Sequence, residues 1–499
     1  MVTRGNSIIA FLSWNVTRSL SLILINLTCL WGVAAPTPMV LSQKDVTQLV
    51  ISQSHKAKET NLKYQQMRLA PFLKLATYDW TFAADTGYEM DHNEGPTHPA
   101  TLTNQTYKSN IKLKKSLITG TTLSFDYSRN SLYGNDVNIA APKVTQYTYD
   151  LLGLTIEQNL WKNAFGSQDR AELEAAELTY QANTITRASE LQDLVLESLR
   201  LYWNTYVSQE NFTEALAARD RYLRFVNDLR RKTSYGYSNS YELYQVQAEL
   251  ENREQQIKTT SLDYLKNTEM LTQLLNLPSE TKIQFPSVDN IPDLPTITQK
   301  NLVDIRNLQS QTIKVKAAEA TLSASQSQAR PQLSLNGSLY GSGFNEKSSL
   351  AENRLMSGAN PKYFIGLKFI FQFGSNLSTQ DIINKKVSLE LEQQRFQRLS
   401  EEFKNNLANA ERKVQTTFFS VSSIKKQSEL REKTLNEMQR NFNNGRVDIN
   451  LLIDAMNKFF ASRAQYTRSV GDYYIALNEW AALNDELIQN PEEDQNDKL

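Results

Sequence analysis

Apolar and polar side chains alternate along three stretches of the chain. A period of two, with one apolar and one polar face, predicts a strand between two different environments. Polar segments at residues 91–106 and 342–360 are expected to be loops beside these strands. The apolar members are Tyr78, Trp80 and Phe82, then Leu123, Phe125 and Tyr127, and finally Ile365, Leu367, Phe369 and Phe371.

Strand alternation alone does not decide the class of protein. A water-soluble sandwich alternates in the same way. The strands here form two isolated groups separated by helical runs, with too few strands in either group for an ordinary sandwich. Transmembrane strands need only ~9–11 residues, which these segments supply. The pattern therefore favours strands that cross a membrane.

Two long runs, residues 168–232 and 377–441, contain neither proline nor glycine. At a rise of 1.5 Å per residue, each would form a rod about 100 Å long. Such a rod cannot fold onto a compact core. Its apolar stripe is too narrow for a buried helix and suits a coiled-coil seam with water on both sides.

A turn containing glycine follows each rod, at Gly236 and at Gly445. Helical spacing resumes after both turns, so each rod is expected to have a returning partner helix. Asn239 and Asp448 can cap the returning helices, because a short polar side chain satisfies amide donors left free at a helix start. The sequence predicts two antiparallel helical hairpins.

The two turns carry one pattern twice, at a constant offset of 209 positions. Internal repeats constrain the whole architecture. Helices at residues 42–69 and 298–329 are expected to precede the strands of each half and to end just before Pro71 and Pro331, which would open strands. The matched pairs are Gly236 with Gly445, Leu243 with Leu452, Tyr264 with Tyr473, and Leu274 with Leu483.

The expected organisation follows from this duplication. A Pro-rich link separates two structural repeats, and the polar end of the chain is expected to be disordered. The segments are a signal peptide at 1–35, a first repeat at 36–278, the link at 279–297, a second repeat at 298–488 and a tail at 489–499.

The first 35 residues have the composition of an export signal. Arg4 and Arg18 precede an apolar run at residues 20–33, which ends in small residues. The alternative is a membrane anchor, but a spanning helix needs ~20 continuous apolar residues and this run is shorter. Cys29, the only cysteine, lies in this segment, and the residues before it do not suit lipoprotein processing. The processed chain would carry no disulfide and no thiolate metal site.

Charge and candidate chemistry exclude several classes of function. Lys plus Arg equals Asp plus Glu at 54 each, so no net field favours nucleic acid. His55, His92 and His98 are the only histidines, and none has a partner at metal-ligand spacing on a helix. Phosphate-binding loops and nucleophile elbows are absent from the sequence. We expect no enzyme activity, no metal and no cofactor.

The order strand, long helix, glycine turn and returning helix, repeated behind an export signal, resembles the TolC family of outer-membrane efflux proteins. The resemblance covers about residues 40–488. Its most specific segment runs from Phe442 to Ala455 through the second turn. The segment at 158–166 is similar to the family's strand-to-helix corner, with Asn159 where proline is usual, so the local bend is in question.

The resemblance implies an α+β membrane protein that assembles as a homotrimer. About four strands per chain would form a shared twelve-stranded barrel in outer-membrane lipid, continued by a long α-helical barrel of hairpins in the periplasm. The first half can hold an additional strand pair, because Pro71 and Gly153 are 82 positions apart while Pro331 and Gly366 are 35 apart. The implied function is a passive exit duct of a tripartite efflux or type I secretion system. The implied partners are a periplasmic adaptor protein and an inner-membrane transporter.

The resemblance also implies roles for three groups of residues. Asp454 matches the second of two aspartates that ring the closed periplasmic entrance in relatives, while Leu451 occupies the place of the first; the alternative for Asp454 is a solvated helix face. The expected periplasmic gate comprises Phe442, Gly445, Arg446, Asp448 and Asp454. The expected adaptor-docking turns comprise Tyr235, Gly236, Asn239, Asn444 and Gly445, and the expected aromatic face of the barrel comprises Tyr78, Trp80 and Phe82.

Two other classes of function remain open at this point. A periplasmic adaptor or scaffold also uses long helical hairpins, although usually one per chain and with soluble β modules. An envelope enzyme with helical insertions is disfavoured by the missing site. The sequence does not identify the transported cargo, since a wide water-filled tunnel needs no specific pocket.

Overall fold

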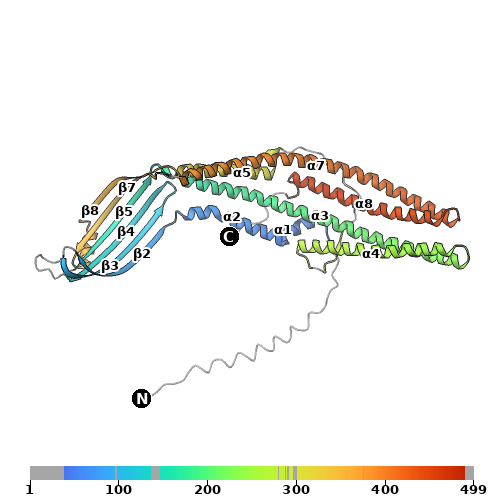
Figure 1. Cartoon of the computed structure of the whole chain (residues 1–499), viewed down its shortest axis with the longest axis horizontal. Coiled ribbons are helices and arrows are strands. Elements are labelled where there is room, and N and C mark those ends of the chain that lie inside the picture. Colours follow the sequence, from blue (N-terminus) through green and yellow to red (C-terminus); the bar gives the residue numbers. More distant parts are fainter. Residues whose placement is uncertain are drawn as a thin grey trace, which may run out of the picture.

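The structure is a computed structural model that describes residues 39–95, 98–135, 146–278, 280–286, 288, 291–295, 301–374 and 376–488. The molecule is elongated, with a sheet at one end and long helices that extend from it to two turns at the other end (Figure 1). The predicted signal peptide at 1–35 and the predicted tail at 489–499 lie outside the described residues.

The sheet contains six antiparallel strands in the order β2-β3-β4-β5-β7-β8. The expectation of about four strands is wrong, because the first half contributes four and the second half two. The additional strand pair that the longer spacing in the first half allowed is present. The predicted strands around Phe125 and Leu367 are β4 and β8. The bounds are β2 Thr81–Gly95, β3 His98–Ser116, β4 Thr121–Asn135, β5 Gln146–Asn159, β7 Gln332–Asn345 and β8 Pro361–Ile370.

The predicted loop at residues 91–106 is also wrong over most of its length. Strands β2 and β3 continue through it, with Asp91 opposite Asn104 and Glu89 opposite Thr106. The sequence of this segment is polar at both sets of alternate positions, so it lacks the alternation that would predict a strand. Its threonines favour extended backbone, because a branched β-carbon fits a pleated strand. The polar composition of this segment therefore predicted a loop where the structure has strands.

One face of the sheet is apolar across its whole width. A single row of cross-strand partners consists of Phe82, Leu113, Phe125, Leu154, Leu339 and Tyr363. Adjacent residues on each strand point to the opposite face. Ser124 and Thr155, for example, are partners on that second face. The predicted alternation around Phe125 is thus a property of the entire sheet.

The region before β2 differs from the prediction. Pro71 lies inside helix α2 (His55–Ala76) and does not open a strand. A proline in a helix removes one backbone hydrogen bond, but ion pairs to helix α3 (Ser167–Ser234) hold α2 on both sides of it. They join Lys63 to Glu190 at 3.3 Å and Lys74 to Glu172 at 2.9 Å. Exposed ion pairs contribute little by themselves, but Pro71 is also buried, as are Ala57 and Tyr64 of the same helix. Tertiary packing therefore overrides the local preference.

This shift of the strand start changes the predicted aromatic face. Tyr78 lies in the turn after α2 and is outside the sheet. Trp80 directly precedes β2, and the Lys115 ammonium lies 5.1 Å from the centre of its ring. Phe82 lies in β2 and is largely exposed on the apolar face. Two of the three predicted residues therefore border or belong to that face.

The second predicted proline boundary is confirmed. Helix α5 (Arg306–Gln328) ends before Pro331, and β7 begins directly after it. The predicted loop at 342–360 is only partly a loop, because residues 342–345 belong to β7 and the segment contains helix α6 (Ser348–Met356). Strand β8 begins directly after it, at Pro361. Alternation of charged and apolar residues over nine positions is too short a signal to separate a helix from a loop.

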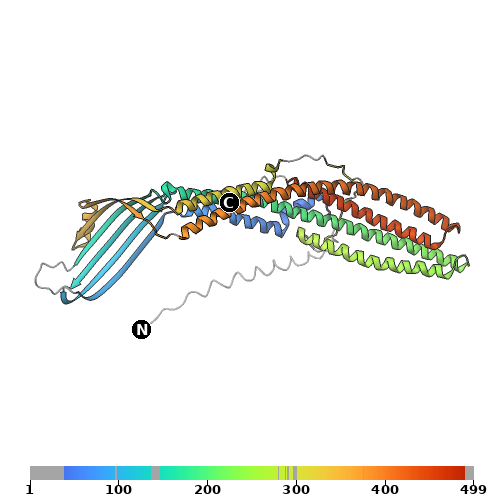
Figure 2. The ribbon, with the colours of Figure 1, turned by 45° about the horizontal axis from the view of Figure 1, so that its top comes forward.

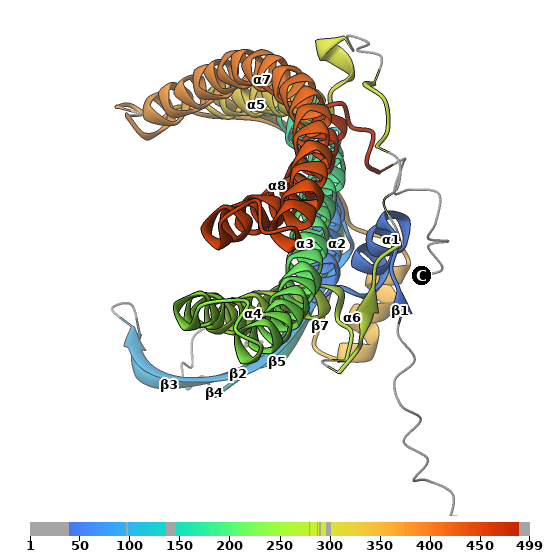
Figure 3. The ribbon, with the colours of Figure 1, turned by 90° about the vertical axis from the view of Figure 1, so that its right-hand side faces the viewer.

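The two predicted helical hairpins are present. Helix α3 returns as α4 (Ser240–Leu275), and α7 (Asn376–Asn443) returns as α8 (Ile449–Leu483). Helices α3 and α7 both have 68 residues. Figures 1 and 2 show the hairpins side by side, and the view along the long axis in Figure 3 shows a curved helical wall with an open concave side. Within the described ranges, no helix is both long and apolar enough to span a membrane.

Short elements complete the middle of the molecule. Helix α1 (Gln43–Gln53) packs on α3, and strand β1 (Met39–Val40) pairs in parallel with β6 (Ile283–Gln284) from the link. The fully buried Tyr202 of α3 donates a hydrogen bond of 3.0 Å to the carbonyl of Leu41. The link and the amino-terminal helix are thus fixed to the same helical wall.

The corner between β5 and α3 is sharply bent. Asn163, Phe165 and Gly166 all have positive φ, at 53°, 48° and 79°. The amide of Asn159 donates a hydrogen bond of 3.1 Å to the carbonyl of Gly120. Proline at this position would have no N–H to donate, so asparagine makes a contact that proline could not make.

Candidate functional sites at the two ends of the molecule

The first hairpin turn exposes a group of tyrosines at the tip. Gly236 has φ of +73°, and no atom lies within 4 Å of the position that a β-carbon would take. Tyr235 and Tyr237 are 75% and 84% exposed. Tyr241 and Tyr244, on the first turns of α4, are also exposed. Sequence reasoning selected only Tyr235, although the close repetition of tyrosine between residues 235 and 244 could have revealed the group.

The predicted caps of both returning helices are at the expected positions. Asp448 is the N-cap of α8, and its side chain accepts a hydrogen bond of 2.8 Å from the amide of Asn450. Asn239 is the N-cap of α4, and its amide donates to the Glu242 carboxylate at 3.4 Å. Open space surrounds the glycine of each turn, and Gly445 has φ of +69°.

The predicted gate residues do not form one cluster. Arg446 and Asp448 are exposed at the second turn, close to Gly445, as is Asn444 of the predicted docking turns. Phe442 is half-buried between the hairpins instead. Its ring centre lies 5.5 Å from that of Phe225, and the ammonium of Lys232 lies 5.0 Å from it.

Asp454 lies on the second turn of α8 and is about half exposed. Its carboxylate pairs with the ammonium of Lys458 at 2.6 Å, one helical turn further along. Exposed pairs at this spacing contribute little to stability, but the ammonium offsets the charge of the carboxylate. Leu451 is exposed one turn before Asp454. The α8 surface near the tip is therefore less acidic than a surface with two unpaired aspartates.

A polar contact that the sequence did not reveal joins the two hairpins below the tips. The Asn457 side-chain oxygen in α8 accepts hydrogen bonds from the Tyr222 hydroxyl at 2.6 Å and from the Arg253 guanidinium at 2.8 Å. Tyr222 is fully buried. Burial raises the pKa of Tyr222, so its hydroxyl stays protonated and donates throughout the physiological range. One acceptor in the second hairpin thus binds both helices of the first.

Ion pairs extend the connection between the hairpins toward the sheet. Arg463 of α8 pairs with Glu214 of α3 at 2.7 Å. Further along, Glu479 of α8 accepts from Arg200 of α3 and from Lys413 of α7, both at 2.7 Å. Glu479 borders a groove of about 370 Å³ between α3, α7 and α8. Among the described residues, no group of side chains is suited to hold a metal ion.

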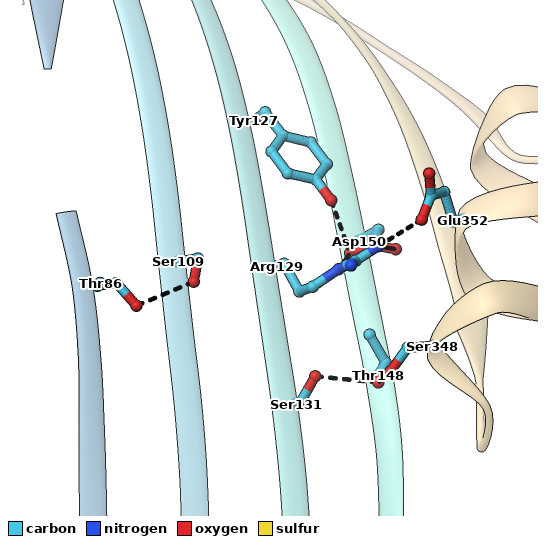
Figure 4. A network of polar contacts seen from close by, with 9 residues as sticks. All are labelled: Thr86, Ser109, Tyr127, Arg129, Ser131, Thr148, Asp150, Ser348 and Glu352. Atoms are coloured by element: carbon cyan, nitrogen blue, oxygen red, sulfur yellow. Dashed lines mark hydrogen bonds and ion pairs between the residues drawn. The ribbon is translucent and has the colours of Figure 1, made fainter. Parts of the chain in front are cut away.

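At the far end of the sheet, a polar network lies on the otherwise apolar face (Figure 4). Asp150 is 0% exposed and accepts two hydrogen bonds from the Arg129 guanidinium, at 2.7 and 2.9 Å. The same guanidinium binds Glu352 of α6 at 3.1 Å, and Thr148 contacts Ser348 of α6 at 2.9 Å. The sequence carried a signal for it, because the alternation in β5 places Asp150 on the face of Leu152 and Leu154.

Glycines in β7 allow α6 to lie directly on the sheet. A β-carbon at Gly343 would be 1.9 Å from the carbonyl oxygen of Ala351. A β-carbon at Gly341 would contact Leu355 at 3.4 Å. Helix α6 therefore covers the Arg129–Asp150 pair, which would otherwise be a charged site on an apolar surface.

The architecture matches solved outer-membrane channels over most of the chain. The CmeC outer membrane channel of Campylobacter jejuni aligns with a TM-score of 0.68 and 14% identity, over 89% of this chain and 86% of that chain. The outer membrane protein VceC from Vibrio cholerae aligns with a TM-score of 0.64 and 10% identity, over 88% and 95%. The open state of the MtrE outer membrane channel of Neisseria gonorrhoeae aligns with a TM-score of 0.60 and 14% identity, over 89% of each chain.

Sequence comparison adds no relative to these structures. Neither a protein-family model nor a curated protein matches the sequence. The structural matches extend from the sheet through both helical hairpins and cover nearly all of each channel chain. The chain therefore has the fold of TolC-like outer-membrane channels.

Proposed function

We propose that this protein is an outer-membrane exit duct that passively conducts substrate across the periplasm and outer membrane of a Gram-negative bacterium. The single observation that carries this proposal is the continuous apolar face of the sheet at one end of two long helical hairpins. An apolar face of this width needs a nonpolar environment. The helices, with polar and charged surfaces, suit water.

Copies of the chain must share the membrane-crossing wall. A strand edge in lipid leaves backbone amides and carbonyls without partners, so sheets span membranes only as closed barrels. Closed bacterial barrels have ~8 or more strands, and one chain provides six in the described sheet. We propose the homotrimer that the family resemblance implies, in which the curved helical wall of each chain forms one third of a tunnel.

The two hairpin tips would meet a periplasmic adaptor protein, with an inner-membrane transporter supplying the energy. Tyr235 and Tyr237 offer exposed aromatic surface there, and aromatic residues are enriched where proteins bind one another. Asp454 would face the entrance of the tunnel. Its pairing with Lys458 supports a weak cation-attracting ring. The duct would lower no chemical barrier.

Opening would separate the two hairpins at the tunnel entrance. The hairpin around Gly445 would move away from α3 and α4, which requires loss of the contacts made by Asn457 and Phe442.

The two hairpins would derive from a duplication of 36–278 and 298–488. The starts of α3 and α7 are separated by 209 positions, the offset of the sequence pattern.

Membrane extraction tests the proposed location. Outer-membrane fractions of cells that produce the protein would be washed first with concentrated salt, then with alkaline carbonate, and finally with detergent. An embedded duct resists the first two washes, since salt screens only electrostatic contacts, and detergent releases it as a trimer. Release by salt alone would contradict the proposal and favour a periplasmic scaffold.

A further inference from the structure

Strands β2 and β3 extend the sheet beyond the four strands per chain that the family resemblance implies. We propose that these two strands are part of the membrane barrel, so that three copies close an eighteen-stranded wall through contacts between β2 of one copy and β8 of the next. This inference rests on the proposed trimeric duct. It departs from the twelve strands that the family resemblance implies.

The apolar face of the sheet supports this proposal, because it continues across β2 and β3. Phe82 of β2 and Leu113 of β3 occupy the same cross-strand row as Phe125 of β4. On the same face, Trp80 and Ile111 are exposed and apolar. A strand pair that folded aside into water would not need this face to continue the pattern of the other four strands.

The opposite, polar face of the sheet also supports the proposal, because an ion pair joins the β2–β3 hairpin to β4. Lys112 of β3 pairs with Asp126 of β4 at 3.5 Å. Within the hairpin, the Asn110 amide donates to Asp85 at 2.8 Å. Polar residues facing a water-filled interior and apolar residues facing lipid are the arrangement of a barrel wall.

Backbone pairing at the two edges of the sheet supports the proposal as well. In the described sheet, β2 pairs only with β3 and β8 pairs only with β7, so these two strands are its edges. All five pairings in the sheet are antiparallel, and six alternating strands leave the two edges running in opposite directions. An edge-to-edge contact between copies is therefore antiparallel as well. It satisfies the backbone groups of both edges.

The consequence is a wider exit. Barrel diameter grows roughly linearly with the number of strands, so eighteen strands give a lumen about 1.5 times as wide as twelve. Barrels of ~16–18 strands leave an open aqueous channel. The duct would therefore not restrict its cargo to small solutes at the outer membrane, and polypeptide-sized cargo would fit the exit.

Cysteine cross-linking identifies which strand meets β8 of the neighbouring copy. Ala84→Cys in β2 would be combined in turn with Tyr363→Cys, Ile365→Cys and Leu367→Cys in β8, and the full-length protein would be treated in membranes with an oxidant or a short thiol cross-linker. Three positions sample the unknown register. The edges of one sheet are about 24 Å apart, at ~4.8 Å per strand, so a bond cannot form within one chain. The matched series replaces Ala84→Cys by Phe125→Cys in β4.

The eighteen-stranded wall predicts covalent dimers and trimers in at least one β2–β8 combination and none in the β4–β8 series. Cross-links in the β4–β8 series would overturn the inference while leaving a twelve-stranded duct intact. Absence of cross-links from both series in a detergent-stable trimer would also overturn it. Purification of the unmodified protein as a monomer that salt removes from the membrane would contradict the proposed duct itself.

Discussion

Single residues set the geometry where strands become helices. Gly166 has φ of +79°, and a β-carbon there would lie 1.7 Å from the carbonyl oxygen of Ile118. Asn163 supports the same corner, since its side-chain oxygen accepts a hydrogen bond of 3.0 Å from the amide of Gln168 at the start of α3. The corner transfers the direction of the sheet to a helix of 68 residues. A small local change is therefore expected to have a large effect.

Replacement of Gly166 by alanine tests this role. The left-handed conformation alone costs an alanine about 1–2 kcal/mol, and the overlap with Ile118 adds to it, so we expect a loss of about 3 kcal/mol or more. The measurement is the apparent melting temperature by circular dichroism. Gly236→Ala is the matched control, because Gly236 has a similar φ but open space around it. Equal melting temperatures of the two variants would contradict the role assigned to the corner.

Asn457 of α8 accepts hydrogen bonds from both helices of the first hairpin. Asn457→Ala leaves the hydroxyl of Tyr222 and the guanidinium of Arg253 without this acceptor, so we expect a loss of about 1–3 kcal/mol. Hydrogen exchange should become faster in the first turns of α8. Asn457→Asp retains an acceptor and should preserve slow exchange.

The control for this experiment is Asn450→Ala on the exposed surface of the same helix. Its side chain is replaceable because the cap contact of this residue uses the backbone amide. Unchanged exchange in Asn457→Ala would show that the hairpins are held together elsewhere.

Whole elements were predictable where a long signal specified them. The absence of glycine and proline over 168–232 and 377–441 predicted α3 and α7 to within a few residues, because intrinsic preference accumulates over a long window. Pro71 misled the prediction because it is buried inside α2, where packing keeps the chain helical through the proline. The strands that run to Gly95 and begin at His98 were missed because polar residues occupy both sets of alternate positions, which removes the alternation on which strand prediction depends.

Sites were less predictable than elements. The glycine turns, the caps Asn239 and Asp448 and the exposed tip residues follow from local sequence. The contact of Asn457 with two distant helices does not, since 235 and 204 positions separate it from its partners Tyr222 and Arg253. Such contacts depend on how the hairpins pack. The Arg129–Asp150 pair likewise required the position of α6.

Helix α6 provides a prediction at the scale of an element. Gly343→Val should force α6 away from β7, because its side chain would occupy the place of the Ala351 backbone. We expect cleavage by added protease at 346–360 to become faster by about tenfold or more, equivalent to at least ~1.4 kcal/mol of docking free energy. Gly337→Val is the control, since that strand position has open space. Equal cleavage rates would contradict the docking of α6 through glycine.

At the scale of the whole molecule, one chain combines a sheet that has an apolar face with helices that carry polar and charged surfaces. The apolar face is continuous over all six strands. The helical wall is curved and carries charge on its surface, as Figure 3 and the ion pairs to Glu479 illustrate. The shared barrel and tunnel that we propose would place the sheet in lipid and the helices in water. The membrane contact of the sheet is the central claim.

Labelling of two adjacent residues in β4 tests this claim most directly. Phe125→Cys lies on the apolar face and Ser124→Cys on the opposite one, and the native Cys29 lies within the predicted signal peptide. An environment-sensitive fluorophore would be attached to each variant, reconstituted in vesicles with and without brominated lipid. The account predicts blue-shifted emission and strong quenching by brominated lipid at position 125, and neither at position 124. Equal quenching at both positions, or quenching at neither, would contradict it.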